Sequence, residues 1–345
     1  MTIRILCTLG PSSLNPDVIT ELTELGVDLF RVNLSHTRVE QVEPTIDLIE
    51  AHSPVPICLD TEGAQIRCGD MEEGVALRVG DVVRLVVGED LVGTRDVIPL
   101  RPEAAVRSLV EQARIQIDFD GAELEVTEPG EEVVAIVTSP GRVRSNKAVV
   151  VTPAPVLPPL SARDREALAI GRARGLRHAA LSFASRPEDV ELVRRLAGPD
   201  THVIAKIESR AGLANLESII DAAESVLIDR GDLSREVPMP YVPYEQKRVI
   251  RCANAANTPV YVATNLLETM VDHVNPTLAE ANDIANTLMD GVHGLVLAAE
   301  TAIGRDPVAA VRTIRTMIDV FREAFHEPRT PWSLPDQGDA GLRAV

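Results

Sequence analysis

One lysine of this sequence stands where a charged side chain is unusual. Only three of the 34 basic residues are lysines, and Lys206 lies inside the apolar run HVIAKIE at 202–208. Because alternate residues of a strand share one face, Lys206 and Glu208 are predicted to lie side by side. A plain ion pair is one interpretation, although the attraction within a buried pair often fails to offset desolvation. The other is a site where an ammonium group, a compact charge with an adjustable pKa, faces a substrate.

A second acidic segment, LIDRGDL at 227–233, follows soon after. Carboxylates are ligands that Mg²⁺ accepts in proteins, with water and substrate oxygens completing its octahedron. We therefore predict that Glu208 and Asp232 hold a divalent cation and that Lys206 faces the same substrate.

Short apolar runs separated by amphipathic segments must position these side chains. Near-continuous apolar strands alternating with helices are typical of a parallel sheet covered by helices. Eight such units predict an α/β fold, a (β/α)8 TIM barrel. A doubly wound open sheet is the alternative, but TLGPSS at 8–13 is a poor version of its glycine-rich first turn. The expected strands are 3–9, 28–34, 55–61, 178–184, 202–208, 225–232, 259–265 and 294–300.

The pattern changes after the third expected strand. Alternating strands broken by Gly, Asp and Pro, as in ARIQIDFDGAELEVTE, predict a small antiparallel β-rich domain, inserted after that strand. Proline-rich VTPAPVLPPL at 151–160 reads as the return linker, and Ser161 as the N-cap of the next helix. The expected domains are a barrel at 1–67 and 156–327, a lid at 68–155 and a loose tail at 328–345.

Polar residues gather after the expected strands. The carboxyl ends of barrel strands meet at one face, where chemistry is usual, so this set is predicted to form a site. Taken singly, several of these residues are also common turn or capping residues, and Arg31 could be a salt-bridging barrel-mouth residue. The basic segment GRVRSNK at 141–147 is either a solvated hairpin or a phosphate contact. The set is Arg31, Asn33, Ser35, His36, Asp60, Thr61, Arg67, Lys206, Glu208, Arg230, Asp232, Thr264, Glu300 and Thr301.

Composition narrows the classes of partner. The net charge of −18 argues against nucleic acid and anionic membranes. The sequence has no apolar stretch long enough for a membrane span, and its first residues lack the pattern of a signal peptide. The four cysteines have no metal-ligand spacing, and Cys7 and Cys58 are expected in the core. A cytoplasmic location fits best.

Several motifs together resemble the pyruvate kinase family over nearly all of residues 3–325. CTLGPSS, FRVNLSH, CLDTEGAQIR, AKIES, DRGDLS, VATNLLETM, PTLAEANDIANTLMDG and LAAETAIGRDPVAAV follow in that family's order and spacing. The resemblance implies a (β/α)8 barrel with a lid inserted after the third strand. It also implies Mg²⁺-dependent phosphoryl transfer between phosphoenolpyruvate and ADP, giving pyruvate and ATP.

The resemblance assigns roles residue by residue. It implies that Glu208 and Asp232 bind Mg²⁺ or Mn²⁺, and that Lys206 stabilises the phosphoryl group in flight and the enolate oxygen. Thr264 would lie beside the methyl carbon of pyruvate and help to protonate it. The substrate would contact Arg31, Ser182, Gly231, Asp232 and Thr264. The nucleotide would border His36, Arg67 and Lys147. A K⁺ site would comprise Asn33, Ser35, Asp60 and Thr61.

The sequence also departs from the family. Glu62, Ala64 and Gln65 stand where the family has Lys, Pro and usually Glu, and a neutral Gln65 leaves K⁺ dependence open. In the eighth-strand motif, the family's Ser and Gly are replaced by Ala298 and Ala299, and a common Lys is replaced by Ile303. In the insert, DFDG at 118–121 matches the family's lid turn imperfectly. The family's C-terminal effector domain would begin where this sequence ends. The usual tetramer and effector regulation are therefore not expected, while a homodimer through barrel helices stays open.

Three functions remain compatible with the sequence. The first is phosphoenolpyruvate–ADP phosphoryl transfer, or a variant using another nucleotide. The second is a divergent enzyme of a specialised pathway, such as a lyase or aldolase that uses the same metal–enolate centre on another 2-oxo acid or acceptor. The third is a non-catalytic paralogue, against which the retained Lys206, Glu208, Asp232 and Thr264 weigh.

Overall fold

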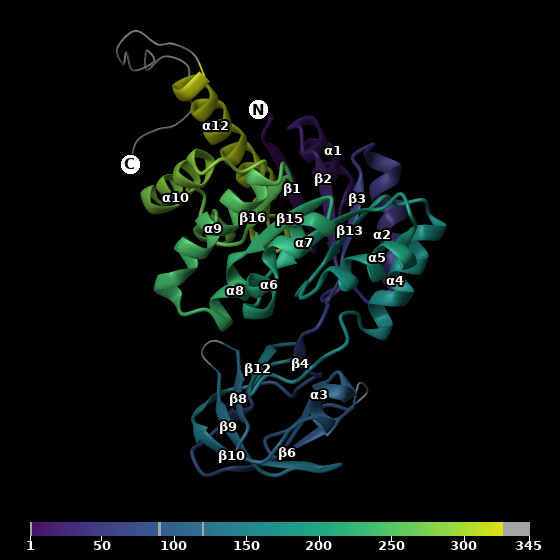
Figure 1. Ribbon diagram of the computed structural model, residues 1–345, viewed down its shortest axis with the longest axis vertical. Coiled ribbons are helices and arrows are strands. Elements are labelled where there is room, and N and C mark those ends of the chain that lie inside the picture. Colours follow the sequence, from purple (N-terminus) through teal and green to yellow (C-terminus); the bar gives the residue numbers. More distant parts are fainter. Residues whose placement is uncertain (1, 89–90, 119–120, 327–345) are drawn as a thin grey trace.

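Eight parallel strands close into a barrel surrounded by helices (Figure 1). The computed structural model describes residues 2–88, 91–118 and 121–326. Strand β1 pairs with β2 on one side and β17 on the other, which closes the sheet. The predicted (β/α)8 barrel is thus confirmed, and the open-sheet alternative is wrong. In barrel order the strands are β1 (Arg4–Leu9), β17 (Gly294–Leu297), β16 (Val260–Ala263), β15 (Ser225–Asp229), β14 (His202–Ile207), β13 (His178–Leu181), β3 (Ile57–Asp60) and β2 (Leu29–Asn33).

Amphipathic helices cover the outside of the barrel. Ile19 and Leu22, one turn apart, are fully buried on one face of the first helix. The predicted N-cap is confirmed, because the Ser161 side chain accepts a hydrogen bond from the Asp164 amide. The helices are α1 (Pro16–Glu24), α2 (Val39–His52), α4 (Ala162–Ala173), α5 (Pro187–Ala197), α6 (Arg210–Ala214), α7 (Leu216–Ala222), α8 (Arg230–Glu236), α9 (Val242–Ala255), α10 (Leu278–Met289), α11 (Ala299–Ala302) and α12 (Pro307–His326), with 3-10 turns at Met239–Tyr241 and Glu268–Val271. No described helix combines the length and apolar character needed to cross a membrane.

The insertion after β3 forms a second, smaller barrel (Figure 1). Its strands in order are β10 (Val133–Ser139), β6 (Val82–Val87), β7 (Val97–Arg101), β4 (Ile66–Cys68), β12 (Ala148–Thr152), β8 (Arg114–Ile117) and β9 (Glu123–Glu128). Helix α3 (Glu103–Arg107) and the short pair β5 (Ala76–Leu77) and β11 (Gly141–Arg142) complete it.

The sequence predicted an antiparallel insert, and one strand pair corrects that prediction. Strands β6 and β7 pair in parallel, with Arg84 opposite Val97 and Val87 opposite Leu100. The domain limits drawn from the sequence, 67/68 and 155/156, remain a proposal. The expected tail at 328–345 lies outside the described residues.

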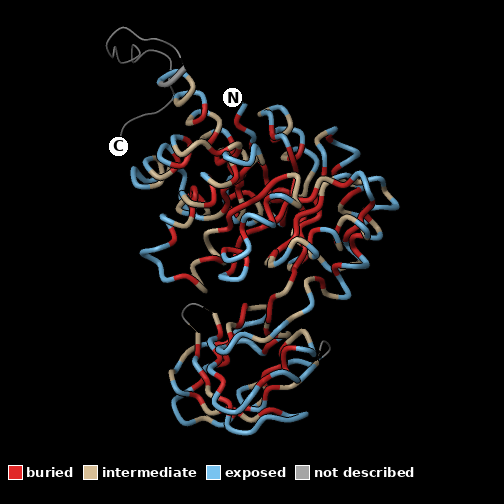
Figure 2. The backbone as a smooth tube through the Cα atoms, in the orientation of Figure 1, coloured by how far each residue is buried: buried red, intermediate tan, exposed pale blue. Residues whose placement is uncertain are grey.

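Each barrel has its own hydrophobic core (Figure 2). In the large barrel, one core fills the space between strands and helices, and a separate small cluster fills the barrel interior. Cys7 and Cys58 are buried in these cores, as expected, and burial raises the pKa of both thiols well above the usual range. The apolar interior of the large barrel is followed, toward the carboxyl ends of its strands, by the polar residues.

Candidate active site

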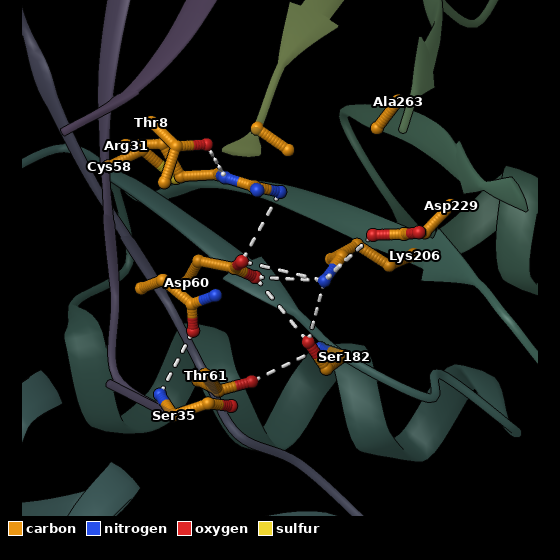
Figure 3. A network of polar contacts seen from close by, with 12 residues as sticks. Thr8, Arg31, Ser35, Cys58, Asp60, Thr61, Ser182, Lys206, Asp229 and Ala263 are labelled. Carbon is orange, nitrogen blue, oxygen red and sulfur yellow. Dashed lines mark hydrogen bonds and ion pairs between the residues drawn. The ribbon is translucent and has the colours of Figure 1, made fainter. Parts of the chain in front are cut away.

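The inward side of the barrel changes from apolar to polar near the carboxyl ends of the strands. The apolar interior includes Leu6, Leu29, Cys58, Ala180, Ile204 and Leu227. Two residues further along the chain, near the carboxyl ends of the same strands, stand Thr8, Arg31, Asp60, Ser182 (just beyond the end of β13), Lys206 and Asp229. Since alternate strand residues share a face, these polar side chains form the next layer of the barrel interior (Figure 3).

Lys206 is the centre of this layer. Its ammonium group lies 2.8 Å from Glu208, 3.3 Å from Asp60 and 3.8 Å from Asp229. It also donates a 2.9 Å hydrogen bond to the hydroxyl of Ser182 (Figure 3). Burial alone would lower the pKa of Lys206, but Asp60, Glu208 and Asp229 raise it strongly, so the amine stays protonated.

Three carboxylates converge beside Lys206. Glu208, Asp229 and Asp232 each place one oxygen within 4.8 Å of the others. Glu208 and Asp232 were predicted from the sequence to lie together, whereas Asp229 was not. Its signal was present: Asp229 follows the buried Leu227 by two residues and therefore shares its inward face.

Burial and the repulsion between like charges disfavour the ionised forms of Glu208 and Asp232. Burial raises the pKa of Glu208 to about 8; Lys206 opposes the rise, and Asp232 and Asp229 add to it. Burial, followed by Asp229, likewise raises the pKa of Asp232. Glu208 is further fixed because its second oxygen accepts a 2.7 Å hydrogen bond from the Phe183 amide. Three hard oxygen donors that repel one another fit Mg²⁺ or Mn²⁺, whose charge would relieve the repulsion.

Arg31 contacts the same carboxylate of Asp60 as Lys206 does (Figure 3). Its Nε donates a 2.8 Å hydrogen bond to Thr8, and its Nη1 lies 3.3 Å from Asp60. Burial would lower the pKa of Arg31, but Asp60 and Asp229 raise it. Its Nη1 is buried without a hydrogen-bond partner among the described residues. A phosphate oxygen would satisfy such a donor.

Thr264 reaches the site through an unusual backbone conformation. It follows the inward-facing Ala263 by one residue, and its φ of +68° turns the chain at the strand end. Its hydroxyl donates to Asp229 at 3.0 Å and accepts a 2.8 Å hydrogen bond from the Gly231 amide. The structure therefore joins Thr264 and Gly231, both expected at the substrate, to the carboxylate cluster.

The four residues of the expected K⁺ site lie on neighbouring strand ends. The side-chain oxygen of Asn33 accepts a hydrogen bond from the Ser35 amide at 2.9 Å, and that of Thr61 accepts one from the Ser182 amide at 3.1 Å (Figure 3). Asp60 is already paired with both buried cations, Arg31 and Lys206. The side-chain oxygens of Asn33 and Thr61 each keep a second lone pair, with which they can still bind a cation. A K⁺ site at these residues stays a prediction.

The three residues expected at the nucleotide meet between barrel and lid. Asn146 links two of them: its carbonyl accepts a 2.8 Å hydrogen bond from Arg67, and its side-chain nitrogen lies 3.4 Å from His36 Nδ1. Burial lowers the pKa of His36, and the charges of Arg67, Arg101 and Lys147 lower it further. Lys147 is paired at 3.0 Å with Asp118.

The altered third-strand motif makes contacts of its own. Glu62 forms a 3.1 Å ion pair with the lid residue Arg101, and both side chains are nearly buried. The Gln65 amide lies 3.4 Å from Asp232 and donates to it. Asp164 holds the turn between them, accepting hydrogen bonds from the amides of Glu62 at 2.7 Å and Gly63 at 3.1 Å. Of the altered eighth-strand residues, Ile303 is exposed. In DFDG, residues 119–120 lie outside the described residues.

Several strand-end residues brace loops instead of facing the site. Arg230 donates to the carbonyls of Thr264 and Asn265 and pairs with Asp283 at 2.6 Å. Glu300 accepts hydrogen bonds from the amides of Leu267 and Ala298. Polar type and position at a strand end therefore identified the region, but not the direction of every side chain.

A cleft between the two barrels borders the carboxylate cluster. Together with the open solvent at its mouth, it encloses about 550 Å³. The large barrel lines the cleft with Asp232, Gln65 and Arg235. The lid lines it with Val149 and Val151 of β12. A small anionic substrate can therefore reach the cluster from this cleft.

Comparisons with known proteins agree with this arrangement. The family model for the barrel domain of pyruvate kinase matches residues 1–311. The pyruvate kinase of Mycobacterium tuberculosis is 35% identical over an alignment 346 residues long. This alignment covers 95% of this chain and 73% of that protein. That of Methylorubrum extorquens is 36% identical over 347 residues, covering 96% and 70%. The crystal structure of Cryptosporidium parvum pyruvate kinase superimposes with a TM-score of 0.86 at 29% identity, covering 93% of this chain and 70% of that one. On these matches and this fold, the chain belongs to the pyruvate kinase family.

Proposed function

We propose that this protein transfers a phosphoryl group from phosphoenolpyruvate to ADP, giving pyruvate and ATP. The observation that carries the proposal is the contact of one buried ammonium, Lys206, with the Glu208–Asp229–Asp232 cluster at the mouth of the barrel. Family membership at about 35% identity supports the same reaction class.

The reaction divides into two steps. In the first, the bond between phosphorus and the enol oxygen breaks while a bond to the terminal phosphate oxygen of ADP forms. In the second, the enolate takes a proton on its terminal carbon and becomes pyruvate. When bound, Mg²⁺ or Mn²⁺ supplies positive charge beside the enolate and phosphoryl oxygens.

The residues of the chain supply charge and position. Lys206 would stabilise the enolate oxygen, and Arg31 would donate to the phosphoryl group, because phosphoryl transfer depends mainly on positioning and charge neutralisation. Thr264 would orient the water that protonates the enolate carbon. Arg67, Lys147 and His36 would border the nucleotide between barrel and lid, and K⁺ would occupy the site of Asn33, Ser35, Asp60 and Thr61.

A second candidate is enolate chemistry on another 2-oxo acid without a nucleotide. One observation favours it: Arg101, a lid cation near the expected nucleotide, is already neutralised by Glu62. Pyruvate formation from phosphoenolpyruvate, measured with and without ADP and Mg²⁺, separates the two. Turnover that needs both supports phosphoryl transfer. Metal-dependent exchange of pyruvate methyl protons, with no nucleotide turnover, supports the second candidate.

A further inference from the structure

Arg235 is a basic residue beside the carboxylate cluster that strand-end reasoning did not identify. It lies one helical turn after Asp232 on α8, and its Nη1 is 3.2 Å from the Oδ1 atom of Asp232. Gln65 donates to the same oxygen at 3.4 Å. One ion pair and one hydrogen bond of the chain therefore already involve an oxygen of a candidate metal ligand.

The charges of the cluster are divided between two cations. Lys206 contacts Glu208 and Asp229, at 2.8 and 3.8 Å, whereas Arg235 contacts Asp232. Against the burial and the charge of Asp229 that raise the pKa of Asp232, Arg235 is the leading group that lowers it. Arg235 thus neutralises Asp232, whereas Lys206 neutralises mainly Glu208 and Asp229.

Arg235 is more exposed than Lys206 and borders two cavities. Its side chain is 25% exposed, whereas that of Lys206 is 5% exposed. It lines the cleft beside Asp232 and also a neighbouring cavity against Gln116 of the lid. Besides burial and Arg101, its charge lowers the pKa of Arg67, so the two arginines act on the same region.

We propose that Arg235 is an internal counterion that competes with a divalent cation for Asp232 and then binds the anionic substrate in the cleft. Binding of a dication beside Asp232 disfavours the guanidinium there. An anion in the cleft accepts the displaced guanidinium, so metal and anion strengthen each other's binding. The inference rests on the proposed metal site and adds a residue that couples that site to the substrate.

Calorimetric titration with MnCl₂, alone and with phosphoenolpyruvate, tests this proposal on the wild type, Arg235→Gln and Asp232→Asn. Arg322→Gln is the matched control, because Arg322 forms the same i,i+3 pair with Asp319 at 3.3 Å on α12. We expect Arg235→Gln to bind Mn²⁺ about fivefold more tightly without substrate, and phosphoenolpyruvate to tighten its Mn²⁺ binding less than in the wild type. Arg322→Gln should match the wild type in both titrations.

The outcomes separate this inference from the proposed function. If Asp232→Asn weakens Mn²⁺ binding but Arg235→Gln leaves it unchanged, the metal site stands and the counterion role is wrong. If Arg235→Gln binds Mn²⁺ more tightly with an unchanged effect of phosphoenolpyruvate, transfer of Arg235 to the anion is wrong. If the wild type does not bind Mn²⁺, or Asp232→Asn binds it equally well, the metal site fails and the inference fails with it.

Discussion

The ammonium of Lys206 lies 2.8 Å from the carboxylate of Glu208, two residues further along the chain, and both side chains are buried. The pair continues into a cluster with Asp229 and Asp232. In an isolated ion pair, the two charges would already neutralise each other. Three mutually repelling carboxylates beside one ammonium group instead carry excess negative charge, which a dication can neutralise. The arrangement therefore fits a catalytic centre better than a structural ion pair.

Removing the ammonium tests its part in catalysis. We expect Lys206→Ala to lower the rate of pyruvate formation from phosphoenolpyruvate about 100-fold or more, because a fixed positive charge beside the enolate is lost. Lys247→Ala is the matched control, since Lys247 is an exposed lysine paired with Asp290. Circular dichroism and thermal melting show whether both variants fold. A folded Lys206→Ala protein with wild-type turnover would show that the amine does not act on the reaction.

Asp229 is expected to be a metal ligand as well. Changing hydrogen-bond partners around a metal commonly costs 10–100-fold in affinity, so loss of a direct carboxylate ligand should cost at least as much. We expect Asp229→Asn to raise the Mn²⁺ dissociation constant about tenfold or more, measured by titration without substrate. Unchanged Mn²⁺ affinity in this variant would exclude Asp229 from the site.

Asp164 is expected to contribute to stability across two segments. Its carboxylate accepts hydrogen bonds from the amides of Glu62 and Gly63 and caps α4 at Ser161. Asp164→Ala should lower the free energy of unfolding by about 2 kcal/mol or more, because buried amides lose their acceptor. Asp189→Ala, which removes only the local acceptor of the Ser185 and Arg186 amides, should cost about 1 kcal/mol. Equal losses in the urea unfolding of the two variants would contradict this role of Asp164.

Two histidines at the amino end of the barrel predict a pH dependence of stability. The rings of His178 and His202 lie 5.4 Å apart. Burial, then His202 and Arg4, lower the pKa of His178 to about 4. In the unfolded chain its pKa is ordinary, so its neutral form favours folding above about pH 6.5, and that contribution falls as pH drops toward 4. The slope for this one proton is at most about 1.4 kcal/mol per pH unit.

The variant His178→Asn isolates this term. Its free energy of unfolding should depend less steeply on pH between 6.5 and 4 than that of the wild type. Urea titrations at several pH values measure the two slopes. Parallel curves for the two proteins would mean that His178 is not the group responsible.

Much of the fold was predictable because its signals are local and repeated. Apolar runs separated by amphipathic segments predicted every strand of the large barrel, and the change of period located the insert. The parallel pairing of β6 and β7 was not predictable, because it depends on the path of a connection and not on the strands themselves. Inward positions at strand ends were readable by the period of two, so Asp229 could have been found from Leu227.

The rest of the site depends on contacts between distant segments. Arg235 lies on a helix, so strand periodicity gives no information about its direction, and only the fold brings it to the cleft. Glu62 and Arg101 belong to different domains, and their pairing depends on how the lid meets the barrel. Arg230 and Glu300 have the right residue type and place, but backbone groups of the neighbouring loops capture their side chains.

The most direct test of this account is the rate at which the purified protein forms pyruvate from phosphoenolpyruvate with ADP and Mg²⁺, each omitted in turn. We predict turnover that needs both and that falls when Asp232 is changed to Asn. No pyruvate under any condition from a folded protein, or pyruvate formed at the same rate without a divalent cation, would contradict the account.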